Sequence, residues 1–468
     1  MKRVLYVLTF IILTIMLIGT FNAYAIPTKN GDSKESTYIV LLKSSTSKED
    51  TIKALEGLGC KVVKYLENIG VVIVKSKDPR FIVKAKLLDF VEDVGFDVKL
   101  KLIDNFMVKP LKNEEVEADL YYNYSWNLRI INADDAWEIT TGSKSVRVAI
   151  LDTGVDFTHE DLARNYDREF SRSFVPPEVE IEFLDIDASE YIPTMDYHGH
   201  GTYVAGIVAA SGRVLGVAPN VKIVNVKVIS AEGYGYLSWI IRGLYYVAEE
   251  RFNVASMSFG GYLDLSDPSH TVAYLALSRA TFYAYTRGVL LVAAIGNDAL
   301  DLDTVRPWVI VPAEIPYVVA VSAVGPVYPP PWPEEPPELP LNAIDVTFAS
   351  YSNYGSSVDI TAPGGDFTRY PADGWWLDMV LSTWSSHSWF LPASYVFAAG
   401  TSVSTPHISG TIALIRSVNP TLGPLMVKMI LYTTAVDKGT PGFDKKYGYG
   451  LVNVYDAVLK AEMLKLKH

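Results

Sequence analysis

Cysteine is almost absent from this chain, because Cys60 is the only one among its 468 residues. No disulfide can form within the chain, and chemistry that needs paired thiols is not expected. Basic residues are also in deficit, since 41 lysines and arginines face 53 aspartates and glutamates, which leaves a net charge of −12. Because neutralising phosphates requires a basic surface, this balance argues against nucleic-acid binding as the main task.

Hydrophobic runs of membrane-spanning length are missing beyond the N-terminus. There, two basic residues precede an apolar run from Val4 to Phe21, and the small-x-small motif AYA follows at 23–25. This pattern is typical of a secretory signal peptide, here residues 1–25. The run is long for a signal peptide, so an uncleaved membrane anchor is the alternative. We therefore expect a secreted, extracellular protein.

Residues 37–102 have the pattern of a small α+β domain. Apolar strand segments alternate with two helical segments, the first with a capping-box-like start at Ser47 and the second over 78–88. The last strand is expected over 96–102, where apolar and charged residues alternate. The order βαββαβ predicts a ferredoxin-like arrangement, which on its own carries no information about function.

A polar, tyrosine-rich stretch at 103–125 is typical of a linker, and a larger α/β region follows it. The strands of this region are continuous apolar runs separated by helical segments, which predicts a parallel sheet covered by helices on both faces. Ligand sites in such sheets lie beyond the carboxyl ends of the strands. The expected strands include 146–151, 221–229, 254–258, 289–295 and 317–325.

Four polar residues stand at such ends or at helix starts. Asp152 and Asn297 follow expected strands, His200 lies in HGHGT, and Ser402 lies in AAGTSVSTPHISG, a turn that leads into a helix. Each has a structural explanation on its own, as a cap, a core residue or a turn residue. Together they supply a nucleophile, a base, a carboxylate that orients the base and an amide donor, which suit acyl transfer.

With these residues in place, the chain resembles the subtilisin-like serine protease family. The motifs that carry the resemblance occur in family order over residues 126–460 and are AILDTGVD, HGHGTYVAGIVAA, GVAPNVKI, SMSFGG, AAIGND, VDITAPGG, GTSVSTPHISG and YGYGLVNV. The resemblance implies a secreted endopeptidase in which Asp152, His200 and Ser402 form the catalytic triad. It also implies that Asn297 supplies the side chain of the oxyanion hole.

The resemblance also divides the chain into functional parts. After the signal peptide, residues 26–102 would be an inhibitory propeptide that assists folding, 103–125 a linker and processing region, and 126–468 the catalytic domain. Self-cleavage is expected between about 100 and 120. The implied partners are a protein or peptide substrate and the chain's own propeptide, with no nucleic acid. The oligomeric state is not predictable.

Residues near the expected site need separate interpretation. His198 is a rival for His200, but the family pattern places the catalytic histidine directly before GT, which selects His200. His407, in the helix after Ser402, is expected to be structural. Asp298 is expected near the base of the primary specificity pocket. A segment expected to pair with the substrate backbone, or alternatively a plain strand end, comprises Ser258, Phe259 and Gly260.

The chemistry requires no cofactor, while a structural calcium ion is left open. An acidic insertion before His200 carries Asp185, Asp187 and Asp196, which could ligate calcium, although a solvated acidic loop is the preferred interpretation. Asp161 matches a calcium ligand of many family members. The loop that would complete that site is short here, which puts calcium there in doubt.

Two further insertions separate Asn297 from Ser402. Residues 325–340 are proline-rich and predict a stiff polyproline loop at the surface. Residues 366–394 are tryptophan-rich, and their aromatic side chains are expected to pack this loop onto its own domain, with a cleft lining or a partner contact as the alternatives. The tryptophans are Trp375, Trp376, Trp384 and Trp389.

Two other functions predict different sequence features. A catalytically inactive, protease-like binding module would use the insertions as its working surface, but the complete set of Asp, His, Asn and Ser argues against it. An esterase of the α/β-hydrolase type would need a GxSxG motif and the order Ser–Asp–His, whereas this chain has the order Asp–His–Ser.

Overall fold

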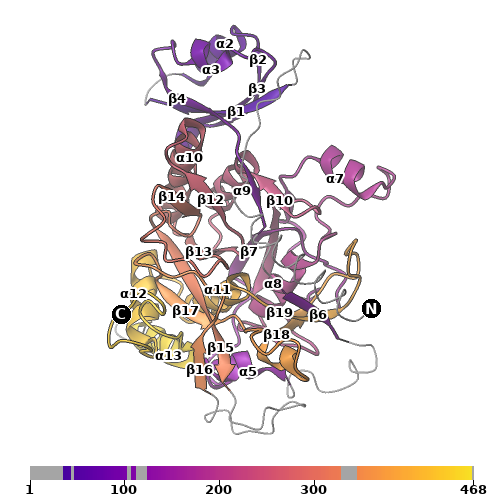
Figure 1. The fold of residues 1–468 in the computed structure, drawn as a ribbon, viewed down its shortest axis with the longest axis vertical. Coiled ribbons are helices and arrows are strands. Elements are labelled where there is room, and N and C mark those ends of the chain that lie inside the picture. Colours follow the sequence, from indigo (N-terminus) through magenta and orange to yellow (C-terminus); the bar gives the residue numbers. More distant parts are fainter. Residues whose placement is uncertain (1–34, 44–46, 103–106, 112–123, 328–344, 466–468) are drawn as a thin grey trace, which may run out of the picture.

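The computed structural model describes residues 35–43, 47–102, 107–111, 124–327 and 345–465. The predicted signal peptide lies outside these residues, as does most of the proline-rich loop. Within them, the chain forms a small N-terminal α+β domain and a larger α/β domain (Figure 1). None of the helices in the described ranges is long and apolar enough to span a membrane.

The N-terminal domain has the predicted order of strands and helices. Its elements are β1 (Ser36–Leu42), α2 (Lys48–Glu56), β2 (Cys60–Leu66), η1 (Glu67–Ile69), β3 (Val71–Ser76), α3 (Phe81–Ala85) and β4 (Val91–Phe96). The strands form one antiparallel sheet in the order β2-β3-β1-β4, as βαββαβ predicts. The side chain of Ser47 accepts a hydrogen bond from the backbone of Asp50, so the predicted cap of α2 is confirmed.

Two details of this domain differ from the prediction. Helix α3 ends at Ala85 rather than at residue 88, because the chain continues in turns there. The fourth strand of the sheet, β4, lies at Val91–Phe96 and shares only Phe96 with the strand expected over 96–102, whereas β5 (Lys99–Lys101) pairs antiparallel with β10 (Tyr234–Tyr236) of the larger domain. The alternating pattern indicated extended backbone correctly, but the partner of that strand belongs to the other domain.

The larger domain is built on one mostly parallel sheet. Its strands in spatial order are β16 (Asp345–Phe348), β15 (Val318–Val327), β13 (Leu290–Ala294), β11 (Val254–Met257), β7 (Arg147–Asp152), β9 (Lys222–Lys227) and β8 (Arg172–Ser173), with β17 (Ile360–Pro363) also beside β15. Only the β15–β16 pair among these neighbours is antiparallel. The predicted parallel sheet is therefore confirmed.

Helices cover both faces of this sheet, as predicted. One face packs against α8 (His200–Ala209), α11 (Thr401–Val418), α12 (Pro424–Thr434) and α13 (Val454–Lys465), and the other against α9 (Leu237–Glu249) and α10 (Pro268–Thr286). Successive residues of β7 alternate between the two faces: Val148 and Ile150 join the first cluster, and Ala149 and Leu151 join the second. Burial on both faces explains why the strands are continuous apolar runs.

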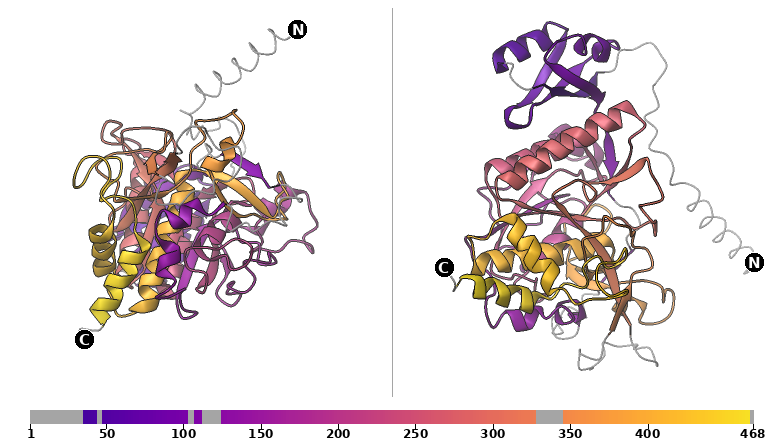
Figure 2. Two further views of the ribbon diagram at one scale, coloured as in Figure 1. Left: turned by 90° about the horizontal axis from the view of Figure 1, so that it is seen from below. Right: turned by 90° about the vertical axis from the view of Figure 1, so that its left-hand side faces the viewer.

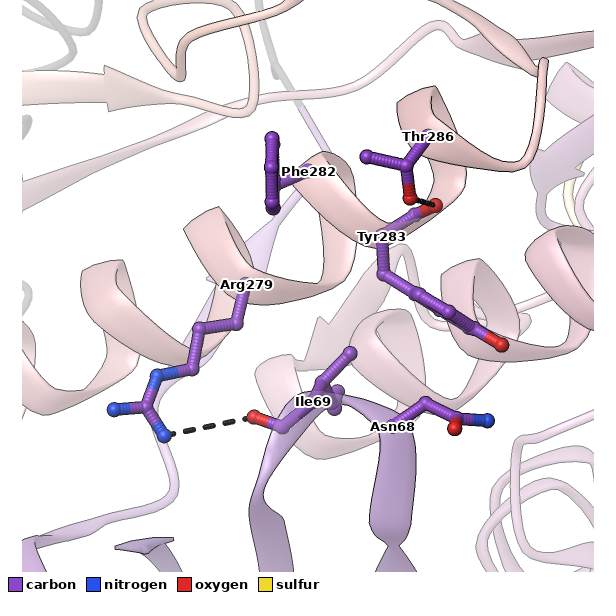
Figure 3. A pocket seen from close by; sticks show the side chains of 6 residues that line it. All are labelled: Asn68, Ile69, Arg279, Phe282, Tyr283 and Thr286. Atoms are coloured by element: carbon purple, nitrogen blue, oxygen red, sulfur yellow. Dashed lines mark hydrogen bonds between the residues drawn. The ribbon is translucent and has the colours of Figure 1, made fainter. Parts of the chain in front are cut away.

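The N-terminal domain sits on α9 and α10 of the larger domain (Figures 1 and 2). Arg279 of α10 donates hydrogen bonds to the backbone carbonyls of Leu42 and Gly70 and contacts the carboxylate of Glu92. A cavity of about 200 Å³ lies at this contact, and Figure 3 shows the side chains that line it. Its lining contains none of the predicted site residues and comprises Asn68, Ile69, Arg279, Phe282, Tyr283 and Thr286.

A second, three-stranded sheet lies beside the start of α11. Its antiparallel strands are β18 (Val380–Thr383), β19 (Tyr395–Ala399) and β6 (Met107–Pro110), with β19 in the middle. Strand β6 falls within the stretch predicted to be a linker, so this stretch contains a structural element that sequence patterns missed. The remaining elements are α5 (Trp126–Arg129), α6 (Ala133–Ala136), α7 (Pro177–Leu184), β12 (Gly261–Asp264), β14 (Trp308–Val311) and η4 (Trp375–Asp378).

Candidate active site

The predicted site residues occupy ends of elements in the larger domain. Asp152 is the last residue of β7, and Asn297 follows β13, a strand parallel to β7 with β11 between them. His200 is the first residue of α8, and Ser402 lies in the first turn of α11. In a parallel sheet, polar residues collect beyond the carboxyl ends of the strands, where these residues stand.

Asp152 and His200 form a buried pair. The distance from Asp152 Oδ1 to His200 Nδ1 is 2.7 Å, and the two side chains are 0% and 2% exposed. Because a carboxylate oxygen accepts, Nδ1 donates to it, and in the neutral imidazole the acceptor nitrogen is then Nε2. The backbone N–H of Thr153 donates to the same Asp152 oxygen at 2.8 Å, which fixes the carboxylate further. An imidazole oriented in this way suits a general base.

Two glycines let α8 begin where the histidine is needed. Gly199 precedes His200 with φ of 113°, and a Cβ there would lie 2.2 Å from the ring of Trp384. A Cβ on Gly201 would lie 2.1 Å from the carbonyl oxygen of Gly154, which follows β7 closely. Side chains at either position would push the start of α8 away from Asp152.

Gly400 keeps a space open between Ser402 and Asn297. A Cβ at Gly400 would lie 3.1 Å from Ser402 Oγ and 3.2 Å from Asn297 Nδ2, so a hydroxyl and an amide donor border the same point. The other end of the amide is fixed, because Asn297 Oδ1 accepts hydrogen bonds from the backbone N–H and the hydroxyl of Thr401, both at 2.8 Å. This geometry suits attack on a carbonyl whose oxygen becomes negative.

His198 and His407 have other surroundings. Nδ1 of His198 accepts a hydrogen bond from the backbone N–H of His200, and its ring packs on Phe390. Burial lowers the pKa of His198 to about 4 despite the nearby carboxylate of Asp196. His407 is buried, donates from Nδ1 to the carbonyl of Val403 and accepts from Asn127 at Nε2, which is a structural arrangement.

The candidate calcium ligands of the acidic insertion do not come together. Both oxygens of Asp196 are engaged: Oδ1 accepts from His198 N, Gly199 N and Thr153 Oγ1, and Oδ2 accepts from the N–H and hydroxyl of Thr202. Asp185 and Asp187 instead lie in the exposed stretch that follows α7. Across the described ranges, no group of three or more His, Cys, Asp or Glu residues is placed to hold a metal ion.

Asp161 faces hydrogen-bond donors rather than oxygen ligands. Its carboxylate accepts from the backbone N–H groups of Arg213 and Val214 and from the hydroxyl of Tyr395. Arg213 and Val214 belong to the short loop after α8, which packs directly against Asp161. Because calcium needs a shell of oxygens, these surroundings do not fit a calcium ion.

The acidic insertion is anchored to the domain by a buried ion pair that sequence patterns missed. Glu180 of α7 lies 2.8 Å from Lys227 Nζ, and both side chains are 0% exposed. Glu180 also accepts hydrogen bonds from the hydroxyl of Tyr191 and the backbone N–H of Ala231, shortly before β10. The predicted solvated acidic loop is therefore wrong for α7, a helix whose Glu180 is buried. Nothing local to Glu180 signals a lysine so far along the chain.

The predicted substrate-binding segment lies beside β5. Ser258 and Phe259 are buried directly after β11, and Phe259 shares an apolar cluster with Leu100 of β5. A Cβ on Gly261 would lie 2.9 Å from Leu100 Cδ2. Strand β5 thus contacts β10 through its backbone. It contacts the segment that continues from Gly260 through the side chain of Leu100.

The tryptophan-rich insertion mostly packs on its own domain. Trp384 is fully buried, and Trp375 and Trp376 are partly buried against the same core. Trp389 is 55% exposed, but its indole N–H donates to the carbonyl of Ala231. The expected packing is confirmed for Trp384.

Asp298, expected near the specificity pocket, accepts a hydrogen bond from the hydroxyl of Tyr262 at 2.6 Å.

Comparisons with known proteins identify the family of this chain. The model of the subtilase family matches residues 143–450. The thermophilic serine proteinase of Bacillus sp. (strain AK1) is 31% identical over 345 residues, which cover 73% of this chain and 68% of that protein. Subtilisin E of Bacillus subtilis (strain 168) is 28% identical over 454 residues, or 95% of this chain and 96% of that protein.

Solved structures show the same fold. The epidermin leader peptide processing serine protease of Staphylococcus aureus superposes with a TM-score of 0.73 at 24% identity, covering 91% of this chain and 98% of that one. Fervidolysin of Fervidobacterium pennivorans, a keratinolytic enzyme related to subtilisin, gives 0.65 at 23% identity over 92% of this chain and 62% of its own. The chain therefore belongs to the subtilase family and is a subtilisin-like serine endopeptidase.

Proposed function

We propose that Ser402, His200 and Asp152 act as the catalytic triad of this endopeptidase. Ser402 Oγ attacks the carbonyl carbon of the scissile peptide bond while His200 Nε2 takes the hydroxyl proton. The same proton passes to the leaving amine as the C–N bond breaks, which leaves an acyl ester on Ser402. A water molecule then attacks the ester by the same steps, which frees the acid and restores the hydroxyl of Ser402. Asp152 stabilises the charged imidazole in both halves of the reaction.

The oxyanion of each tetrahedral intermediate would be held by Asn297 and by the backbone N–H of Ser402. The support is the position of Asn297 Nδ2 across the space that Gly400 leaves open. An amide fixed before the reaction begins stabilises developing charge without reorganising. No step of this chemistry calls for a cofactor, and no nucleic-acid partner is proposed.

The buried Asp152–His200 hydrogen bond of 2.7 Å carries the proposal. The alternative of an inactive binding module makes the opposite prediction for labelling by a fluorophosphonate, which reacts only with an activated serine. Wild type and Ser404→Ala should be labelled, whereas Ser402→Ala should not. Ser404 is a matched control because it is buried in the same helix. An unlabelled wild type would favour the binding module.

We further infer that the protein is made as a secreted precursor with a signal peptide at 1–25, a propeptide at 26–102, a processing region within 103–125 and a catalytic domain at 126–468. Strand β5 supports the inhibitory role, because it pairs with β10 and Leu102 N donates to the carbonyl of Gly233 at 2.7 Å. A Cβ on Gly233 would lie 3.6 Å from His198 Nε2, so β5 leads toward the histidines.

The strands on either side narrow the expected cut. Residues up to Leu102 lie along β10, and residues from Met107 onward lie along β19, so we place the cut between these two residues. The purified Ser402→Ala precursor should stay uncut, because loss of the nucleophile removes most of the rate. N-terminal sequencing of the mature wild type should give a start between 103 and 107. Maturation of the Ala variant at the wild-type rate would exclude self-processing.

A further inference from the structure

Strand β6 is a segment of the proposed processing region that lies on the catalytic domain. It pairs antiparallel with β19 over four residues, with Met107 opposite Ala399 and Pro110 opposite Val396. Ala399 stands three residues before Ser402, the expected nucleophile. Strand β6 therefore begins beside the residues that lead into Ser402 and runs away from them along β19. The backbone N–H of Leu111 adds a further hydrogen bond to the carbonyl of Tyr395 at 3.0 Å.

One side chain of β6 has a specific partner. Lys109 Nζ lies 3.3 Å from the centre of the Trp376 ring, a cation–π contact. Trp376 belongs to η4 in the tryptophan-rich insertion, and it is partly buried against the main core. The ring is therefore held by the catalytic domain, and the cation is supplied by β6.

Strands β5 and β6 flank the proposed cut and lie along different strands of the larger domain. Strand β5 runs along β10 toward the histidines, and β6 runs along β19 away from the start of α11. Only residues 103–106 separate Leu102 from Met107. The chain thus has the direction of a substrate, with β5 upstream and β6 downstream of the bond to be cut. Both strands are bound by strand addition, a general mode of peptide recognition.

We propose that Trp376 selects a lysine or arginine among the substrate residues that lie along β19 downstream of the scissile bond. Strand β6 is the chain's own occupant of this position, and Lys109 is the selected residue. The ligand class is an extended peptide with a basic side chain a few residues beyond the cut. This proposal rests on the triad and on self-processing as described above.

The test compares self-processing of purified precursors refolded from denaturant, followed by gel electrophoresis. Lys109→Gln and Trp376→Leu should each slow the cut about 2- to 10-fold, since an exposed or partly desolvated cation–π contact accounts for a change of this size. Lys109→Arg should process at nearly the wild-type rate, and Lys109→Glu should be slowest. The double variant Lys109→Gln/Trp376→Leu should be no slower than the slower single variant, because both remove the same contact.

Trp375→Leu is the neighbouring control. Trp375 lies beside Trp376 in η4, and its ring contacts Tyr370 and, edge-to-face, Trp376. Its loss should slow processing less than Trp376→Leu does, because Lys109 Nζ lies over the Trp376 ring. A tetrapeptide anilide, which has no residues downstream of the cut, should be hydrolysed equally by the mature wild type and the mature Trp376→Leu variant. A purely structural role of Trp376 would instead lower this activity too.

The outcomes distinguish a failure of the Trp376 proposal from a failure of the proposed function. Equal processing rates for all Lys109 variants, with active wild type, would overturn the selection by Trp376 and leave the proposed function standing. A wild type that neither processes itself nor hydrolyses the anilide would overturn the proposed function instead. If Trp376→Leu does not fold, the Lys109 series decides alone, because these substitutions change only the occupant strand.

Discussion

Asn297 shows how one side chain is fixed by the end that does not take part in chemistry. Its Oδ1 accepts two hydrogen bonds from Thr401, the residue directly before Ser402, so the amide and the nucleophile are positioned by the same turn. Aspartate at 297 would keep these two hydrogen bonds and lose only the donor. This makes Asn297→Asp a sharper probe than alanine, which removes both ends.

We predict that Asn297→Asp and Asn297→Ala both lower kcat by roughly 10²–10³-fold or more, the usual effect of losing one oxyanion donor. The KM for a peptide anilide should change little, because the carbonyl becomes an oxyanion only after attack. Steady-state kinetics on one substrate measures both constants, and fluorophosphonate labelling with a thermal melt controls for folding. An Asp variant with wild-type kcat would remove this side chain from the mechanism.

At this scale, the sequence indicates the candidate catalytic residues but not the partners of the other carboxylates. Asp152, His200 and Ser402 stand in local motifs whose glycines and turns are needed wherever the motif occurs. The partners of Asp161 and Glu180 were not predictable, because Arg213, Val214 and Lys227 come from distant segments. A carboxylate in an acidic loop has the same local pattern whether it faces water, a metal ion, a backbone N–H or a buried lysine.

At the scale of elements, helix α9 depends on the N-terminal domain for its cap. The residue before it, Tyr236, makes no side-chain cap. Instead, Leu237 N donates to the carbonyl of Val98 at 2.9 Å, and Ser238 donates its N–H and its hydroxyl to the two carboxylate oxygens of Asp97. A carboxylate at a helix N-terminus satisfies donors that the helix cannot satisfy itself.

Docking should therefore depend on pH. Desolvation at the contact raises the pKa of Asp97 from 3.8 to about 7, although hydrogen bonds from Ser238 and Val98 oppose this. A carboxyl whose pKa is higher when docked takes up a proton on docking. Docking should then be strongest below about pH 4 and weaken as the pH rises through the window up to about 7.

The check is the fraction of the N-terminal fragment that co-elutes with the catalytic domain of the processed chain on gel filtration at several pH values. Asp97→Asn keeps an acceptor but cannot titrate, so its fraction should vary less over the same window. A wild type and an Asn variant with parallel pH curves would show that another group governs docking.

Strand patterns predicted backbone conformation but not partners. The alternation at 96–102 was correctly interpreted as extended, yet β5 leaves its own sheet for β10. Strand β6 was missed because four residues that end in proline, within a polar stretch, give too little periodicity to predict a strand. What makes these residues a strand is the edge of β19 with which they pair, which is far away in the sequence.

At the scale of the whole molecule, the N-terminal domain is bound to the catalytic domain through α9, α10 and β10 (Figures 1 and 2). After a cut between Leu102 and Met107, these contacts hold a separate chain. Diluting the processed protein should release the fragment and raise the specific activity on the tetrapeptide anilide over time. A specific activity that does not vary with protein concentration would contradict inhibition by the fragment.

Dilution does not release strand β6, because the same cut leaves it covalently joined to the catalytic domain. Its local concentration at β19 is set by the length of the connecting chain, is on the order of millimolar for short flexible connections, and does not fall on dilution. A long polypeptide must compete with this tethered strand, whereas a short anilide does not meet it. Processing would thus turn one continuous inhibitor into two, of which dilution can remove only the first.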